Sequence, residues 1–217
     1  RPLSRGLGDV YKRQPLYHFF RQNFSQVTNP PIDSLRENKV MSLKTRFGNL
    51  GNILNFDNLT KDNIYVLNSP ILSNSQFLKF NNFFKKKIKL IDCSFKKDEN
   101  LDVVLERIRK DSEIAVRQGS TQIILSDKNI SDDRLPVPML LAVGAVNTYL
   151  IKHKLRGYVS INVQSGEAMD THSFATLIGV GATTVNPYLA LDGLYQRFEK
   201  KLFGKFQYEE CVSRYIK

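Results

Sequence analysis

The feature of this 217-residue chain that most constrains its fold is a regular alternation of short apolar segments with longer amphipathic ones between residues 87 and 201. The short segments have the length and composition of strands, and the longer ones carry apolar residues at helical spacing. The expected strands are 87–95, 121–126, 157–164 and 183–186, and the expected helices are 101–118, 138–153, 171–180 and 187–201. Apolar strands joined by helices are typical of parallel sheets, so we predict an α/β fold, either an incomplete barrel or an open, mainly parallel sheet with surrounding helices.

Shorter elements are expected before this region. They are an aromatic-rich helix at 16–24, a helix at about 34–43, a strand at 63–67 and a helix at 73–84. Ser73 or Asn74 can cap the last helix, because a side-chain oxygen at the N-cap accepts a hydrogen bond from a free backbone N–H. Later in the chain, Gly179 and Gly181 lie between an expected helix and an expected strand. This order predicts a tight turn, since a phosphate-binding loop leads from a strand into a helix.

A rigid turn precedes the expected helix at 34–43. Pro30 and Pro31 fix two φ angles, and they keep Asn29 out of the helical region. The apolar positions of the helix are Leu35, Val40, Met41 and Leu43. Local physics alone allows an ordinary proline-bounded loop here as well as a specialised junction.

The chain is strongly basic, with a formal net charge of +11 and a pI of about 9.6. Such a charge can bind nucleic-acid phosphates, but that requires lysines and arginines gathered on one surface. The densest cluster, 85–87 with Lys89, leads directly into an apolar run, as expected for charges that flank a strand. We therefore predict no nucleic-acid partner.

Two cysteines, Cys93 and Cys211, lie far apart in the sequence and lack the spacing of metal ligands. This pattern favours a reducing compartment. No apolar run approaches the roughly 20 residues that cross a bilayer. We expect a cytoplasmic protein with no membrane partner and no metal or cofactor of its own.

The two ends of the chain differ from the rest. Residues 1–14 show no apolar periodicity, and we expect them to be a non-native or disordered leader. Residues 15–217 then form one domain, because their number supports one substantial core. The sequence ends at Lys217 within a helical pattern, so we expect a piece of a longer protein.

Two residues that follow the expected strand 157–164 could perform acid–base chemistry. Glu167 and His172 lie where catalytic groups collect in barrel enzymes, since the carboxyl ends of parallel strands face the active site. An imidazole titrates near neutral pH, and a carboxylate can orient it. The alternative is structural: His172 binds nearby backbone at a helix start, and Glu167 pairs with a neighbouring cation.

Several motifs, in order along the chain, resemble the central domain of the glutamate synthase large subunit. They are FSQVTNPPID at 24–33 with RE at 36–37 and VMSL at 40–43, EIAVRQG at 113–119, IILSD at 123–127, PVPMLLAV at 136–143, SGEA at 165–168 and NPYLA at 186–190. The resemblance covers nearly all of the chain from Phe19 onward. It identifies 15–217 as part of that domain, ending near the start of an FMN-binding synthase domain.

The resemblance implies a function for the longer protein. Glutamate synthases convert glutamine and 2-oxoglutarate, with a reductant, into two glutamates. A glutaminase domain releases ammonia, which travels through an internal tunnel to the FMN-binding synthase domain. Electrons arrive through a 3Fe-4S cluster from a small NADPH-oxidising subunit, NADH or ferredoxin. The family's catalytic cysteine and its FMN and cluster sites lie outside the central domain, so neither Cys93 nor Cys211 takes those roles.

For this chain, the resemblance implies a non-catalytic domain that links the two active centres and helps shape the ammonia tunnel. Thr28 and Asn29, on the rigid turn, are the candidates for lining it. Two positions depart from the family: Gln164-Ser165 replaces a commoner Glu-Thr, and 147–149 replaces a histidine-rich triplet. The alternative function is a self-contained α/β-barrel enzyme that uses Glu167 and His172, and it requires both side chains in one pocket.

Overall fold

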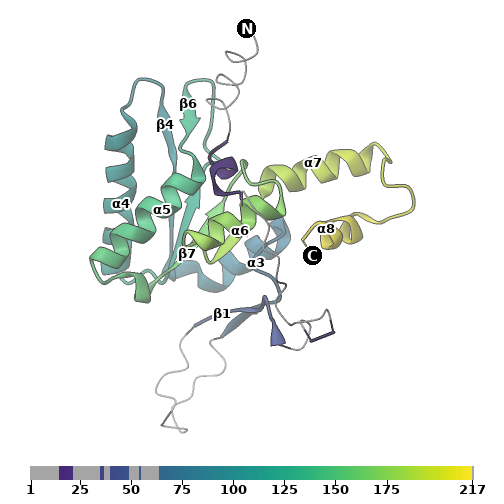
Figure 1. Cartoon of the computed structure of the whole chain (residues 1–217), viewed down its shortest axis with the longest axis horizontal. Helices are drawn as coiled ribbons and strands as arrows, with labels where there is room; N and C mark the ends of the chain where they lie inside the picture. The colour runs from purple at the N-terminus through teal and green to yellow at the C-terminus, as the bar shows by residue number, and fades with distance from the viewer. Residues whose placement is uncertain (1–14, 22–34, 37–39, 49–53, 55–63, 217) are drawn as a thin grey trace.

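The computed structural model describes residues 15–21, 35–36, 40–48, 54 and 64–216. Its centre is a parallel sheet of four strands in the order β3-β5-β7-β8 (Figure 1). The strands are β3 (Ile88–Asp92), β5 (Gln122–Ser126), β7 (Ser160–Gln164) and β8 (Thr184–Asn186). All neighbouring strands pair in parallel, which confirms the predicted α/β class. The described residues form an open sheet and no closed barrel.

Three helices connect successive strands and cover one face of the sheet. They are α4 (Leu101–Arg117), α5 (Met139–Lys152) and α6 (Thr171–Gly179). Because each connection joins neighbouring parallel strands in the same sense, right-handed crossovers place all three helices on the same side. The main core lies between these layers, and it includes Ile123, Leu125, Ile161, Val163 and Val185 from the strands and Ile108, Val143, Val146, Leu150 and Leu177 from the helices.

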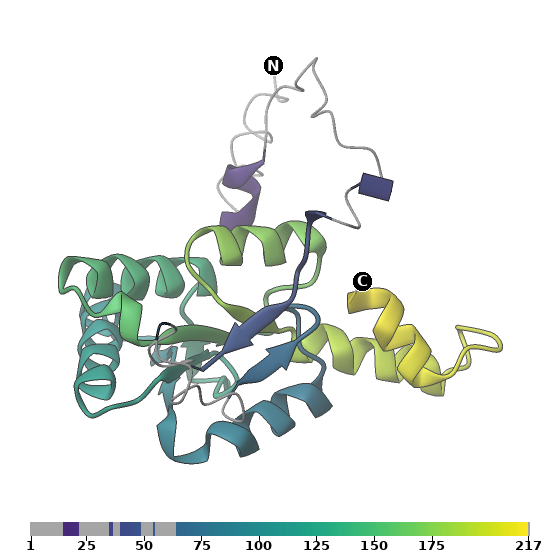
Figure 2. The same ribbon diagram turned by 90° about the horizontal axis from the view of Figure 1, so that it is seen from below.

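The opposite face of the sheet is covered by α3 (Asn74–Phe84) and a small antiparallel pair, β1 (Thr45–Phe47) with β2 (Tyr65–Leu67). Figure 2 shows α3, in blue, and α6, in light green, on opposite sides of the sheet. A second core forms here from Phe47, Leu67, Leu72, Phe77, Phe80, Phe84 and Ile124. Ser73 caps α3 through a reciprocal pair of bonds with Gln76, which confirms the predicted N-cap.

The strand residues that face α3 are largely polar, although they are buried. Asn162 donates to the Gln122 side chain at 3.0 Å and accepts from the Thr184 hydroxyl at 2.7 Å. Asn186 continues the network, since it donates at 3.0 Å to the Leu72 carbonyl, in the segment that pairs beside β8. These groups therefore satisfy one another across three strands and fix the sheet against α3.

The remaining elements lie around the sheet. They are η1 (Leu16–Phe20), η4 (Lys85–Lys87), the antiparallel pair β4 (Ser94–Lys96) and β6 (Arg134–Pro136), η5 (Arg156–Tyr158), α7 (Tyr188–Glu199) and α8 (Tyr208–Ile216). Figure 1 shows α7 extending away from the sheet, with α8 folded back beside it. The part of the chain that the structure describes contains no helix long and apolar enough to span a membrane.

Four of the sequence-based boundaries need correction. The strand expected at 157–164 begins only at Ser160, because 156–158 form the 3-10 helix η5. The strand expected at 87–95 is divided at Cys93, because β4 leaves the parallel sheet to pair with β6. The helix expected at 16–24 is a 3-10 helix that ends at Phe20. In the expected helix at 34–43, Leu35, Arg36 and Val40 are helical, whereas 41–44, which lead into β1, belong to neither a helix nor a strand. Leu35 and Val40 are exposed, so the expected apolar face is not buried within this chain.

Candidate functional site

The carboxyl ends of the parallel strands are where open α/β sheets place their ligands, and here they bring four polar residues together. Asp127 follows β5, Ser165 and Glu167 follow β7, and Tyr188 follows β8. Asp127 is buried, with only 3% of the residue exposed. In the sequence, Asp127 stands out only as the last residue of the motif at 123–127, yet it is the centre of this cluster.

Asp127 fastens the loop that follows β7. Its carboxylate accepts hydrogen bonds of 3.0 Å from the Ser165 hydroxyl and from the Gly166 backbone N–H, and the Tyr188 hydroxyl donates to it as well. Burial raises the pKa of Asp127 despite these donors. Burial and the neighbouring Asp127 together raise the pKa of Tyr188 to about 12, so its phenol stays protonated and keeps donating.

Gly166 is required by the close approach of Tyr188. A Cβ atom at this position would lie 2.9 Å from the Tyr188 hydroxyl oxygen and 3.4 Å from a methyl carbon of Leu189. Both contacts belong to the start of α7, so the glycine lets the β7 loop pack directly on that helix. The motifs at 165–168 and 186–190 are thereby explained as two halves of one packing contact.

Glu167 provides the missing cap of α5. The N-cap residue, Pro138, has no side-chain donor or acceptor, and the Met139 backbone N–H donates instead to the Glu167 carboxylate at 3.0 Å. A carboxylate at a helix N-terminus is favoured by the free N–H groups and by the helix dipole. Burial nevertheless raises the pKa of Glu167, and the nearby Asp127 adds to that rise.

His172 has a separate partner. Its Nε2 donates to the Tyr17 backbone carbonyl at 2.8 Å and so holds η1 against α6. A small pocket of about 290 Å³ lies at the strand ends and is lined by Asp127, Ile130, Pro136, Pro138, Gly166, Glu167, Tyr188 and Leu189. Glu167 lines it and His172 does not. The acid–base pair required by the alternative enzyme is therefore not supported, and for His172 the structural expectation holds.

The glycines near 180 form a turn, as predicted, but only one of them needs to be glycine. Gly181 has φ +125°, and a Cβ there would lie 2.4 Å from the Asn147 side chain. Arg156 closes the turn by donating to Asn147 and to the backbone carbonyl of Gly181. Gly179, in contrast, has open space around it. Asn147, one of the departures from the family pattern, thus has a structural role.

The two cysteines are free and buried. Burial, with Asp127 and Asp92 adding to it, raises the pKa of the Cys93 thiol to about 12. Such a thiol is a poor nucleophile, because the thiolate is the reactive form. Within the described residues, no group of three or more His, Cys, Asp or Glu side chains could hold a metal ion. Thr28 and Asn29, the candidate tunnel residues, lie outside the described residues.

The fold and this strand edge define an open α/β domain in which the polar groups at the strand ends hold loops and helix starts in place. Comparison with known proteins identifies its family. Residues 10–217 match the family described as the glutamate synthase central domain. The chain belongs to this family.

Relatives in bacteria and plants agree. The chain is 49% identical to the large chain of the NADPH glutamate synthase of Azospirillum brasilense, over 97% of this chain and 14% of the relative. It is 40% identical to that of Bacillus subtilis, over 95% of this chain and 13% of the relative. It is also 40% identical to the ferredoxin-dependent chloroplastic enzyme of Spinacia oleracea, over 83% of this chain and 12% of the relative. The chain thus matches a small part of each.

Proposed function

We propose that this chain serves as the central domain of a glutamate synthase, which converts glutamine and 2-oxoglutarate, with a reductant, into two glutamates. The observation that carries the proposal is the family match over residues 10–217, supported by 49% identity to a bacterial large chain. That large chain is about seven times as long as the matched part, which makes up 14% of it. The complete activity therefore belongs to a longer polypeptide.

Within that polypeptide, the domain links the glutaminase domain to the FMN-binding synthase domain and helps shape the route that ammonia takes between them. A closed route limits the escape and protonation of ammonia. Thr28 and Asn29 line it, on the rigid turn made by Pro30 and Pro31. This assignment rests on the likeness of the 24–43 motif to the family.

The domain by itself is inactive and holds no cofactor. Its best acid–base candidates are already engaged, because Glu167 caps α5 and His172 binds the Tyr17 carbonyl. FMN and the 3Fe-4S cluster belong to other parts of the longer chain. The reductant is NADPH, NADH or ferredoxin, the three donors that the names of the relatives print, and a small NADPH-oxidising subunit would be the partner in the first case. A cytoplasmic location fits the two free, buried cysteines.

The test is to replace Pro30 and Pro31 with glycine in the full-length enzyme. Glycines loosen the turn, so we expect glutamine to be hydrolysed in excess of the 2-oxoglutarate consumed. The matched control places two glycines in the exposed turn after β4, at Lys97 and Asp98, and should leave the two reactions stoichiometric. If the Pro30/Pro31 variant also remains stoichiometric, the turn has no coupling role.

A further inference from the structure

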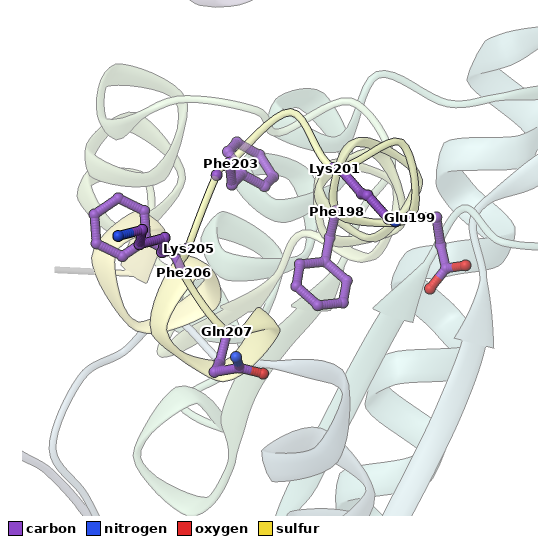
Figure 3. A pocket seen from close by; sticks show the side chains of 8 residues that line it. Phe198, Glu199, Lys201, Phe203, Lys205, Phe206 and Gln207 are labelled. Carbon is purple, nitrogen blue, oxygen red and sulfur yellow. The ribbon is translucent and has the colours of Figure 1, made fainter.

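A groove of about 520 Å³ lies between the end of α7 and the turn that leads into α8. Figure 3 shows the Phe198 ring projecting from α7 below the Phe203 ring, while the Phe206 ring is turned away from Phe198 on the other side of the turn. The full lining is Phe198, Glu199, Lys201, Phe203, Gly204, Lys205, Phe206 and Gln207. Phe198 and Phe203 are half-buried, and Phe206 is 42% exposed.

The walls of this groove are fixed by contacts within the domain. Phe198 packs on Tyr208, the first residue of α8, with 5.8 Å between ring centroids. The guanidinium of Arg214 stacks on the Phe206 ring at 4.2 Å. At the far end of α8, the Tyr215 hydroxyl donates to the Met169 carbonyl at 2.8 Å, next to α6. The opening is therefore part of the fold and not a gap beside a loose loop.

The chemistry of the groove selects its occupant. The lining is shared about equally by polar and apolar surface, and its phenyl rings offer an apolar patch that can hold a single bulky side chain. The charged side chains of the lining are two basic ones, Lys201 and Lys205, and one acidic one, Glu199. A matching segment would therefore pair its apolar side chain with carboxylates.

The size of the relatives indicates where such a segment comes from. This chain covers 14% of the large chain of Azospirillum brasilense and 13% of that of Bacillus subtilis, so most of the surface available to it belongs to the rest of such a polypeptide. The groove residues lie inside the family match of 10–217, which makes the groove part of the domain itself.

We propose that the groove between α7 and α8 receives an acidic segment, carrying one bulky apolar side chain, from another domain of the same longer polypeptide. The proposal rests on the proposed function only in that the chain is one domain of several. It does not depend on the ammonia route, so the coupling experiment on Pro30 and Pro31 can fail while this contact remains, and the reverse also holds.

The first test is zero-length carbodiimide cross-linking of the full-length polypeptide, with the linked peptides identified by mass spectrometry. We expect Lys201 or Lys205 to be joined to an Asp or Glu outside residues 1–217, with a yield that does not change on dilution. Links to a second copy that vanish on dilution would contradict the proposal. So would the absence of any link beyond the domain's own carboxylates, and that result would leave an anionic membrane or nucleic acid as the partner of these lysines.

Comparing Phe203→Ala with Leu202→Ala distinguishes the loss of a groove contact from a change elsewhere in the same turn. Phe203 lines the groove, whereas its neighbour Leu202 is 67% exposed and does not. Losing the apolar contact should lower the yield of the Lys201 and Lys205 links about tenfold in Phe203→Ala and leave it unchanged in Leu202→Ala. Equal yields in the two variants would overturn the proposal.

A second measurement covers the case in which Phe203→Ala disturbs the turn. Hydrogen exchange of residues 200–207 in the full-length polypeptide should accelerate about tenfold when Lys201 and Lys205 are both changed to Glu, because repulsion replaces attraction. The control Lys200→Glu alters the same turn outside the lining and should leave the rate unchanged. Unchanged exchange in the double variant would count against an acidic occupant.

Discussion

Replacing Asp127 with alanine should destabilise this domain more than any other single change at the strand ends. The change leaves three donors without their acceptor: the Ser165 hydroxyl, the Gly166 N–H and the Tyr188 hydroxyl. A buried donor left unpaired costs about 1–3 kcal/mol, so three would cost about 3–9 kcal/mol if nothing relaxed. Removing a buried carboxylate recovers part of this, and we expect a net loss of about 3–5 kcal/mol.

The assay is urea unfolding followed by circular dichroism, which suits a chain without tryptophan. Asp127→Asn keeps one acceptor oxygen and should lose only about 1–2 kcal/mol. Asp98→Ala, at an exposed turn, is the control and should stay within about 0.5 kcal/mol of the wild type. The reasoning fails if Asp127→Ala unfolds at the same urea concentration as Asp98→Ala.

The difference in unfolding free energy between the wild type and Asp127→Asn should also depend on pH. Burial raises the pKa of Asp127 in the folded state, so the folded state holds its proton more tightly than the unfolded state. The resulting stabilisation is fully present below the unfolded pKa of about 3.9 and is lost as pH rises through the folded value. The stability advantage of wild type over Asp127→Asn should therefore shrink from acidic toward neutral pH. An advantage that grows with pH would show that the hydrogen bonds outweigh burial.

Two further outcomes follow from the same geometry. Gly181→Ala should lower the free energy of unfolding in urea by about 2–4 kcal/mol, since it strains a positive φ and overlaps Asn147. The control Gly179→Ala should change it by less than about 1 kcal/mol. Similar losses in the two variants would refute the turn geometry. Cys93 should resist alkylation by iodoacetamide at pH 8 in the native protein and should react after unfolding in urea, because its thiol is buried. Peptide mass mapping measures the alkylation, and rapid reaction in the native protein would contradict the burial of Cys93.

The main architecture follows from local sequence rules, because α3, α4 and β5 each combine a strong apolar pattern with a clear start or end signal. Several of the shorter elements do not follow, although the expected strands at 63–67 and 183–186 correspond to β2 and β8. β1, β4 and β6 have three residues each, and they exist because a partner strand is nearby, which periodicity cannot report. The division of 87–95 at Cys93 has the same cause.

The polar pattern of β7 shows a second limit. Ser160, Asn162 and Gln164 alternate with apolar residues, a pattern that normally indicates a solvent-exposed face. Here α3 covers that face, and Asn162 is fully buried with its bonds made to neighbouring strands. The sequence of a strand does not show which other element will pack on it.

The strand-end site was predictable in location and not in chemistry. Parallel strands place their carboxyl ends together, so Glu167 was correctly expected at that edge. The bonds that define its role come from elsewhere, since Asp127 lies 39 residues before Gly166 in sequence and Met139 lies 28 before Glu167. The apparent catalytic pair is therefore a set of structural contacts.

The central claim is that this chain is a linking domain between two active centres of one long enzyme, and sequencing the DNA that flanks its coding segment tests it most directly. We predict an upstream glutaminase region with a cysteine at its processed N-terminus and a downstream FMN-binding barrel region, both in the same reading frame. Natural stop codons on both sides of the segment would contradict the claim.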